Sequence, residues 1–341
     1  MREVARQSPE NLRALIANTS AKTGLSAAIV EKDFWVCWLL DFLFCLSPWR
    51  KRMAFKGGTS LSKAYGLIER FSEDVDLILD WRLLGYRADE PWEPRSNTRQ
   101  DIFNERANAQ SAAFLSEQFV PQLADGLSEA LGRPVDVRVD EDDPNTVVFR
   151  YPQTFADSAI LRGIRLECGC LAAWTPARIR PVRPYAAGVY PRLFSRQECG
   201  VFTVEAERSF WEKATILHRE AMRTERQGPM PPRYSRHYYD LWCMCRAGTK
   251  DAALARLPLL AEVVAFKRKF YRCAWARYEE ATPQAIRLVP PESAWPALEA
   301  DYAHMQNMIF GTRPAFREIL DTFRALETEL HTIPWTPVPP E

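Results

Sequence analysis

The sequence predicts an α+β protein in which a mixed β-sheet is flanked by helices and followed by a helical C-terminal domain. Extended segments with alternating apolar residues concentrate between residues 51 and 170, whereas segments with helical periodicity precede and follow them. A proline-rich connection at 176–191 separates the second helical region from the rest. With 341 residues, 47% of them hydrophobic and 12% aromatic, the chain has enough apolar material for one large or two modest packed domains.

The pattern divides the chain into four parts. These are an N-terminal helical layer packed on the core at 1–50, a core domain at 51–190, a helical C-terminal domain at 200–330 and a flexible tail at 331–341. The helical layer contains two apolar stripes, at 12–16 and 29–43. Glu31, Lys32 and Asp33 stand at the head of the second stripe, where acidic residues suit the helix dipole. We therefore expect a cap on a core-facing helix rather than a direct catalytic role.

The core domain begins with a strand, turn, helix, strand unit. A short apolar strand at 53–55 precedes a glycine turn, an amphipathic helix that extends through Ile68, and a second strand at 75–79. The following segments are, in order, an exposed loop at 82–98, a helical stretch at 101–131, a hairpin at 135–151 and a strand at 160–170. We therefore expect a core sheet of about five strands, most of them joined by hairpins or a helix.

The C-terminal domain is predicted from four stretches of helical periodicity. They cover 205–224, 233–246, 251–281 and 294–328. Within the third, residues 266–272 interleave basic and aromatic side chains, which suits an RNA-backbone contact, although a solvated helix face is the favoured interpretation. Lysine plus arginine number 45 against 44 acidic residues, so the global charge does not indicate a chain that coats nucleic acid.

The N-terminus carries charged residues and no apolar signal-peptide segment, and no apolar run approaches the roughly 20 residues that a bilayer requires. We therefore expect a cytoplasmic protein with no membrane association. Eight cysteines in a chain of this length fit reduced, mostly buried thiols better than a disulfide framework.

The first candidate for chemistry is the glycine turn after the first strand. Gly57 and Gly58 let the backbone approach a ligand closely, and the N–H groups at the start of the next helix then point toward an anion such as a triphosphate. Thr59 and Ser60 add hydroxyl donors at the same place, where simple helix capping is the alternative. A Gly-Gly turn without Walker spacing is by itself weak evidence for phosphate binding.

Two aspartates occur in the strand after that helix. Asp74 and Asp76 are two positions apart, so both carboxylates project from one face of the strand and can share a Mg²⁺ ion, which prefers hard oxygen ligands. A solvated strand edge explains the same pattern equally well. Glu167, on the outward face of a later strand, is the third carboxylate of a two-metal site if the two strands are neighbours. Its alternative role is a pairing with Arg165 or Arg162 on the sheet surface.

Together these motifs resemble a known family. The segment Phe55-Lys56-Gly57-Gly58-Thr59-Ser60-Leu61-Ser62-Lys63-Ala64-Tyr65, followed by Arg70-Phe71-Ser72-Glu73-Asp74-Val75-Asp76-Leu77, is similar to the signature of AbiEii/AbiGii-type nucleotidyltransferase toxins. Further blocks that resemble the family occur in the same order at 30–36, 164–169, 210–214 and 238–241. The resemblance thus extends from about residue 30 to residue 245.

The resemblance implies a DNA-polymerase-β-like nucleotidyltransferase fold that uses a nucleoside triphosphate with Mg²⁺ or Mn²⁺. It implies that the family's Gly-Ser element falls on Gly58-Thr59 and that Asp74 and Asp76 are the family's metal-binding pair. We expect Lys56-Gly57-Gly58-Thr59-Ser60 to be the nucleotide-binding segment. Glu167 completes the expected acidic cluster as a further metal ligand. Thr59 departs from the family's usual serine but keeps a hydroxyl group.

Lys213 matches the family's helical lysine and Asp240 its later aspartate, so the resemblance implies that both are catalytic. An ammonium group near the triphosphate would offset charge on the phosphates as the bond to pyrophosphate breaks. A salt bridge to Glu205 is the alternative role for Lys213. Asp240 could orient Lys213 or the base, or could instead pair with Arg233 or Arg236 between helices.

As a whole, the sequence predicts a Mg²⁺-dependent nucleotidyltransferase, the toxin of a bacterial toxin–antitoxin or phage abortive-infection system. It would transfer a nucleotide from a nucleoside triphosphate to an acceptor such as the 3′ end of a tRNA, and a cognate antitoxin would be its partner. Two alternatives stay open at this point. One is a regulator that binds nucleotide without turnover. The other is a kinase-like phosphotransferase on the same fold, which would release a nucleoside diphosphate in place of pyrophosphate.

Overall fold

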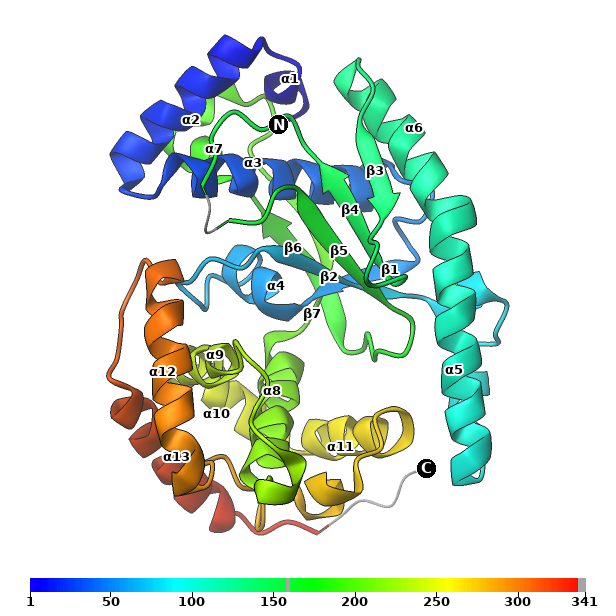
Figure 1. The fold of residues 1–341 in the computed structure, drawn as a ribbon, viewed down its shortest axis with the longest axis vertical. Helices are drawn as coiled ribbons and strands as arrows, with labels where there is room; N and C mark the ends of the chain where they lie inside the picture. Colours follow the sequence, from blue (N-terminus) through cyan, green and yellow to red (C-terminus); the bar gives the residue numbers. More distant parts are fainter. Residues whose placement is uncertain (158–159, 337–341) are drawn as a thin grey trace. The chain divides into compact units, whose positions relative to one another are not determined.

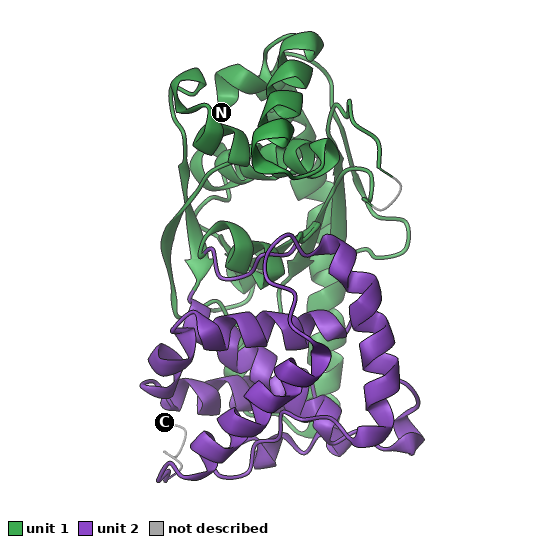
Figure 2. Ribbon diagram, turned by 90° about the vertical axis from the view of Figure 1, so that its left-hand side faces the viewer, with its two compact units in different colours: residues 1–65, 71–204 green, residues 66–70, 205–341 purple. Residues whose placement is uncertain are grey.

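The structure is a computed structural model that describes residues 1–157 and 160–336. The chain forms two compact units, coloured separately in Figure 2. The sheet unit comprises Met1–Tyr65 and Phe71–Val204, and the helical unit comprises Gly66–Arg70 and Glu205–Glu341. The short segment Gly66–Arg70 therefore belongs to the helical unit although it interrupts the sheet unit in sequence. Part of the predicted tail, 337–341, lies outside the described residues.

The sheet unit is built on a mixed sheet of seven strands in the order β3-β4-β5-β2-β1-β7-β6 (Figure 1). The strands are β1 (Met53–Lys56), β2 (Asp74–Leu79), β3 (Asp136–Val139), β4 (Thr146–Arg150), β5 (Ile164–Gly169), β6 (Ala177–Val182) and β7 (Cys199–Val204). β2 pairs in parallel with β5, as β1 does with β7, and the remaining neighbours are antiparallel. The predicted α+β class with a mixed sheet is confirmed.

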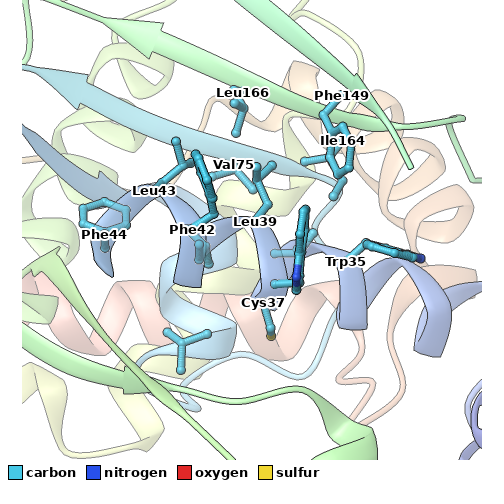
Figure 3. Close-up of a cluster of buried hydrophobic side chains, with 14 of the residues drawn as sticks. Trp35, Cys37, Leu39, Phe42, Leu43, Phe44, Val75, Phe149, Ile164 and Leu166 are labelled. Atoms are coloured by element: carbon cyan, nitrogen blue, oxygen red, sulfur yellow. The ribbon is translucent and has the colours of Figure 1, made fainter. Parts of the chain in front are cut away.

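Helix α3 (Ala27–Asp41) lies against one face of this sheet, and its side chains are buried nearly all round. Ser26 caps the helix by accepting the N–H of Ile29. Trp35 and Trp38 meet edge to face with their ring centroids 5.5 Å apart, and Trp38 lies 6.0 Å from the ring of Phe149. Figure 3 shows this hydrophobic core, in which side chains of the helix meet those of β2, β4 and β5.

The remaining helices of the sheet unit explain why α3 is buried on nearly all sides. They are α1 (Arg2–Ala5), α2 (Pro9–Thr23), α4 (Gly57–Lys63), α5 (Asn97–Phe114), α6 (Val120–Leu131) and α7 (Tyr185–Val189), with a π-helical turn at Leu115–Phe119 between α5 and α6. α2 and α7 both contact α3, as do β5 and β7. Since α3 contacts both the sheet and a second helical layer, an apolar stripe on one side would not suffice.

The expected sheet of five strands is wrong, because β6 and β7 were not predicted. β6 occupies the stretch that the sequence marked as a proline-rich connection. It is an edge strand of the sheet, and Pro181 is tolerated there because one side of an edge strand has no ladder to which it must donate. The prolines of this stretch led us to predict a connection, although an edge strand can contain proline.

Two expectations about helices are also corrected. α4 ends at Lys63 rather than Ile68, because Gly66–Arg70 leaves the sheet unit. The segment 31–33 does not cap α3, which begins at Ala27, so these residues lie in the body of the helix and are buried. Their charges are matched inside the sheet unit instead of at a helix end.

The helical unit contains α8 (Ala206–Ala221), α9 (Ser235–Arg246), α10 (Thr249–Leu254), α11 (Pro258–Phe270), α12 (Trp295–Met305) and α13 (Phe316–His331). The predicted helices at 251–281 and 294–328 are each broken, the first near Pro258, which starts α11, and the second between α12 and α13. Gly66–Arg70 joins this unit through an isolated bridge between Arg70 and Ile309. No helix of the described residues is long and apolar enough to cross a membrane.

Candidate active site

The three predicted carboxylates lie on neighbouring strands, as the prediction for Glu167 requires. In the parallel register of β2 with β5, Asp76 stands opposite Glu167 and Asp74 stands opposite Arg165. Val75 is fully buried in the core that contains α3, so the residues on either side of it project from the other face of the sheet. The strand pairing therefore gathers three carboxylates on one face.

Asp74 has a carboxylate oxygen without a partner. Its Oδ1 is buried, and no hydrogen-bond donor among the described residues reaches it. An unsatisfied buried acceptor costs about 1–3 kcal/mol, so such an atom in a native structure requires an explanation, for which a bound ion is one. A carboxylate oxygen next to a second carboxylate suits a divalent cation.

The carboxylates of this face suit a cation that keeps several water or phosphate ligands, as Mg²⁺ does. Among residues 1–157 and 160–336, no group of three histidine, cysteine, aspartate or glutamate side chains is placed to hold a metal ion alone. Mg²⁺ typically uses one or two protein carboxylates and completes its shell with waters and substrate phosphates. Asp74 and Asp76 fit this donor set. The metal contact of Glu167, which lies beside Asp76 in the sheet, stays a prediction.

Gly57 leaves room for the carboxylate of Asp76. Its φ is +79°, and a Cβ at this position would lie 1.8 Å from Asp76 Oδ2. A larger residue would therefore be strained and would displace the carboxylate. Lys56 stands opposite Asp76 in the register of β1 with β2, and Gly58 follows in the first turn of α4. The start of α4 thus lies directly against a predicted metal ligand.

The hydroxyl groups of Thr59 and Ser60 are engaged within the protein. Thr59 Oγ1 donates to the carbonyl oxygen of Asp74 at 2.5 Å, and Ser60 Oγ donates to the carbonyl oxygen of Gly57 at 2.8 Å. Both residues are buried. The Thr59 bond joins α4 to the start of β2 and so positions Asp74, whereas the Ser60 bond lies within α4. Contacts of the two hydroxyls with phosphate stay a prediction.

In the helical unit, Lys213 and Asp240 are in direct contact. Lys213 Nζ on α8 lies 2.8 Å from Asp240 Oδ2 on α9. Arg70 binds the same carboxylate through two bonds, from Nε to Oδ1 at 2.6 Å and from Nη2 to Oδ2 at 2.8 Å. Asp240 is fully buried. Of the roles that the sequence left open for Asp240, this geometry corresponds to the one in which it orients Lys213.

Charge keeps Asp240 ionised despite its burial. Burial by itself would raise the pKa of this carboxyl group, but Arg70 and Lys213 outweigh burial and hold the pKa of Asp240 well below its usual range. Arg70 was missed as a candidate. Its signal in the sequence was its place at the head of the motif Arg70–Leu77, but its partner is distant in the chain.

Similarity to known proteins identifies the family to which the chain belongs. No curated protein sequence matches the chain. Among solved structures, MenT4, a nucleotidyltransferase toxin from Mycobacterium tuberculosis H37Rv, is 16% identical over 93% of this chain and 97% of its own, but its TM-score of 0.42 is too low to show a shared fold. The model of the family described as nucleotidyl transferase AbiEii toxin, type IV toxin–antitoxin system, matches residues 39–322. The protein therefore belongs to the AbiEii family and is a nucleotidyltransferase, as the resemblance implied.

Proposed function

We propose that this toxin transfers a nucleotide from a nucleoside triphosphate to an RNA acceptor, such as the 3′ end of a tRNA, with Mg²⁺ or Mn²⁺ as its cofactor. The observation that supports this most directly is the buried, unpartnered Oδ1 of Asp74, on the same strand face as Asp76. An oxygen without a donor beside a second carboxylate is what a divalent cation would satisfy. Such a cation, held by Asp74 and Asp76, would supply positive charge for binding phosphate oxygens and for activating an attacking hydroxyl.

Each predicted site residue has a role in this proposal. Asp74 and Asp76 would hold the metal ion, and Glu167 would add a third carboxylate on the neighbouring strand. The segment 56–60 would bind the triphosphate, chiefly through backbone N–H groups because the hydroxyl groups of Thr59 and Ser60 already donate within the protein.

Lys213 and Asp240 are proposed as the catalytic residues of the helical unit. An ammonium group binds phosphate as a point charge and can offset the charge that develops on the leaving pyrophosphate. The contact with Asp240 fixes where that ammonium lies. Since the pKa of Asp240 is held low, its carboxylate stays charged and keeps this contact across the physiological range.

The test is transfer of label from each of the four radiolabelled nucleoside triphosphates to total RNA in the presence of Mg²⁺. We expect wild type to label RNA and to release pyrophosphate, and Asp76→Ala to lose at least about 100-fold of the rate because the metal loses a ligand. Asp89→Ala, which changes an exposed carboxylate elsewhere on the sheet unit, is the matched control and should keep wild-type activity.

The products distinguish this proposal from its alternatives. Release of a nucleoside diphosphate in place of pyrophosphate would indicate phosphotransfer. Tight nucleotide binding with no pyrophosphate release and no labelled product would contradict the proposal and indicate a binding protein. Labelled RNA can then be sequenced at its 3′ end, which identifies both the acceptor and the transferred nucleotide. Because the family belongs to a toxin–antitoxin system, we also propose an antitoxin as the partner, whose presence should suppress labelling.

A further inference from the structure

Three consecutive charged residues of α3 are buried in the sheet unit, and each contacts a different part of it. Glu31 contacts a loop, where it accepts the N–H groups of Thr154 and Phe155. Asp33 contacts two helices, since it pairs with Lys63 at the end of α4 and accepts the N–H of Tyr185 at the start of α7. Lys32, between them, contacts the segment that leads into β2. This contact has no place in the function proposed so far.

Lys32 is part of a closed buried network. Its Nζ lies 3.2 Å from Glu73 Oε2 and donates to the carbonyl oxygen of Leu161 at 3.0 Å. The N–H of Leu161 donates to the same Glu73 oxygen at 2.7 Å. The side chains of Lys32 and Glu73 are 1% and 4% exposed, so water hardly screens their interaction. Glu73 is therefore held from two directions.

Glu73 immediately precedes Asp74, the first residue of β2. Asp74 also makes the first pair of the ladder between β2 and β5, so this ladder does not hold the backbone at Glu73. In an extended segment, successive side chains point to opposite faces, so an anchor on Glu73 on the side of α3 determines how Asp74 is presented on the other face. Lys32 thus fixes the backbone at the point where the sheet ceases to do so.

The energetics of this pair favour a positioning role over a stabilising one. Removing two charges from water offsets most of their attraction, and a buried ion pair is often no better for stability than apolar side chains of the same volume. Groups that hold a metal ligand from behind, in contrast, strongly affect metal affinity. We propose that Lys32 is a positioning residue that, through Glu73, places the Asp74 carboxylate for cation binding. This inference rests on the metal site of the proposed function.

The test measures Mn²⁺ binding to the full chain without nucleotide, by electron paramagnetic resonance of free Mn²⁺. We expect Lys32→Met to weaken Mn²⁺ binding by about 10- to 100-fold, the range typical for residues that support metal ligands. A pure charge effect has the opposite sign, because removal of a cation near the carboxylates would tighten binding. Unchanged or tighter binding by Lys32→Met would overturn the proposal.

A second variant separates positioning from folding. Lys32→Met leaves the Glu73 carboxylate buried beside an apolar side chain and should also lower Tm. The double variant Lys32→Met/Glu73→Gln removes that charge and keeps an acceptor for the N–H of Leu161. We expect its Tm to recover toward that of wild type while Mn²⁺ binding stays weak. Recovery of both together would show that Lys32 acts only through stability, which would overturn the proposal.

The control and the wild type complete the design. Asp41→Asn changes another buried carboxylate of α3, whose partner is Arg2 at 2.6 Å. We expect it to lower Tm without changing Mn²⁺ binding. If wild type binds no Mn²⁺, the metal site of the proposed function fails, whereas wild-type binding that Lys32→Met leaves unchanged contradicts the positioning role alone.

Discussion

At the scale of single residues, the candidate site depends on the contacts that place its carboxylates. Gly57 makes room for Asp76, and the hydroxyl of Thr59 holds the backbone of Asp74. The sequence identified these residues by type and spacing. It could not show their contacts, because a glycine that makes room for a carboxylate and one that approaches a phosphate look alike in a sequence. The distinction depends on side chains brought together by the β1–β2 pairing.

Replacement of Gly57 by alanine tests the first contact. An L-residue at φ +79° is strained by about 1–2 kcal/mol, and its Cβ would also displace the Asp76 carboxylate. We expect Gly57→Ala to lower the rate of nucleotide transfer by about 100-fold, the effect of misplacing a reacting group by roughly 1 Å. The measurement is kcat alongside the free energy of unfolding.

Gly24 offers a matched control. Its φ is +74°, but a Cβ there would meet nothing within 4 Å. Gly24→Ala should therefore lose a similar amount of stability from backbone strain and keep its activity. Equal loss of activity in both variants would show that strain, and not the contact with Asp76, limits catalysis.

His218 predicts how stability depends on pH. Its Nδ1 accepts the N–H of Arg287 at 3.0 Å, and its Nε2 lies 3.2 Å from the carbonyl oxygen of Arg277, so the ring fits its place only when neutral. Burial accordingly lowers the pKa of His218 below its usual value of 6.5. Between these two pKa values the unfolded chain binds a proton that the folded chain does not, so stability falls as pH falls below about 6.5.

The check is the free energy of unfolding from urea titrations between pH 7.5 and 5. We expect His218→Asn to be less stable than wild type at pH 7.5 and to lose less stability on acidification, since its amide does not titrate. His304→Asn, at an exposed position, controls for removal of a histidine. If the free energy of unfolding falls with pH as steeply in His218→Asn as in wild type, His218 is not the cause of the pH dependence.

At the scale of elements, local pattern predicted β1 to β5 and missed β6 and β7. Strand β5 alternates buried residues with half-buried or exposed ones, and the sequence showed that alternation. Local pattern failed for β6, whose side chains are mostly exposed and whose Pro181 suggested a loop. Edge strands need neither an apolar face nor every N–H, so their patterns are weak.

The contact between α8 and α9 through Lys213 and Asp240 supports a further prediction. Asp240→Asn leaves the cations of Arg70 and Lys213 buried without their anion. Removal of one partner from a buried ion pair costs about 3–5 kcal/mol, and we expect Asp240→Asn to lower the free energy of unfolding by that amount. Urea unfolding followed by tryptophan fluorescence measures the loss.

Asp301 supplies the comparison for this variant. Its carboxylate accepts the N–H groups of Arg233 and Ser235 near the start of α9 and contacts neither Lys213 nor Arg70. Asp301→Asn should cost about 1 kcal/mol, as expected for weakened neutral hydrogen bonds. A loss from Asp240→Asn no greater than this would indicate that the cluster contributes little to the helical unit.

At the scale of the whole molecule, the two units are not continuous stretches of sequence, and local pattern does not show this. The predicted domains, at 51–190 and 200–330, are continuous stretches of sequence and stay a prediction. The structure instead assigns Gly66–Arg70 to the helical unit. Leu67 and Ile68 look like the continuation of an amphipathic helix, but the segment that contains them pairs with a distant one through Glu69 and Arg70. Long-range pairing of this kind has no signature in hydrophobic periodicity.

The insertion of Gly66–Arg70 affects when the helical unit can fold during synthesis. Arg70 is 170 positions ahead of Asp240, so at about 5–20 residues per second it is added to the chain about 8–35 s before its counter-charge. By then every strand of the sheet has already been translated. The contact of Lys213 with Asp240 can therefore form only in the second half of translation, after the whole sheet has been made.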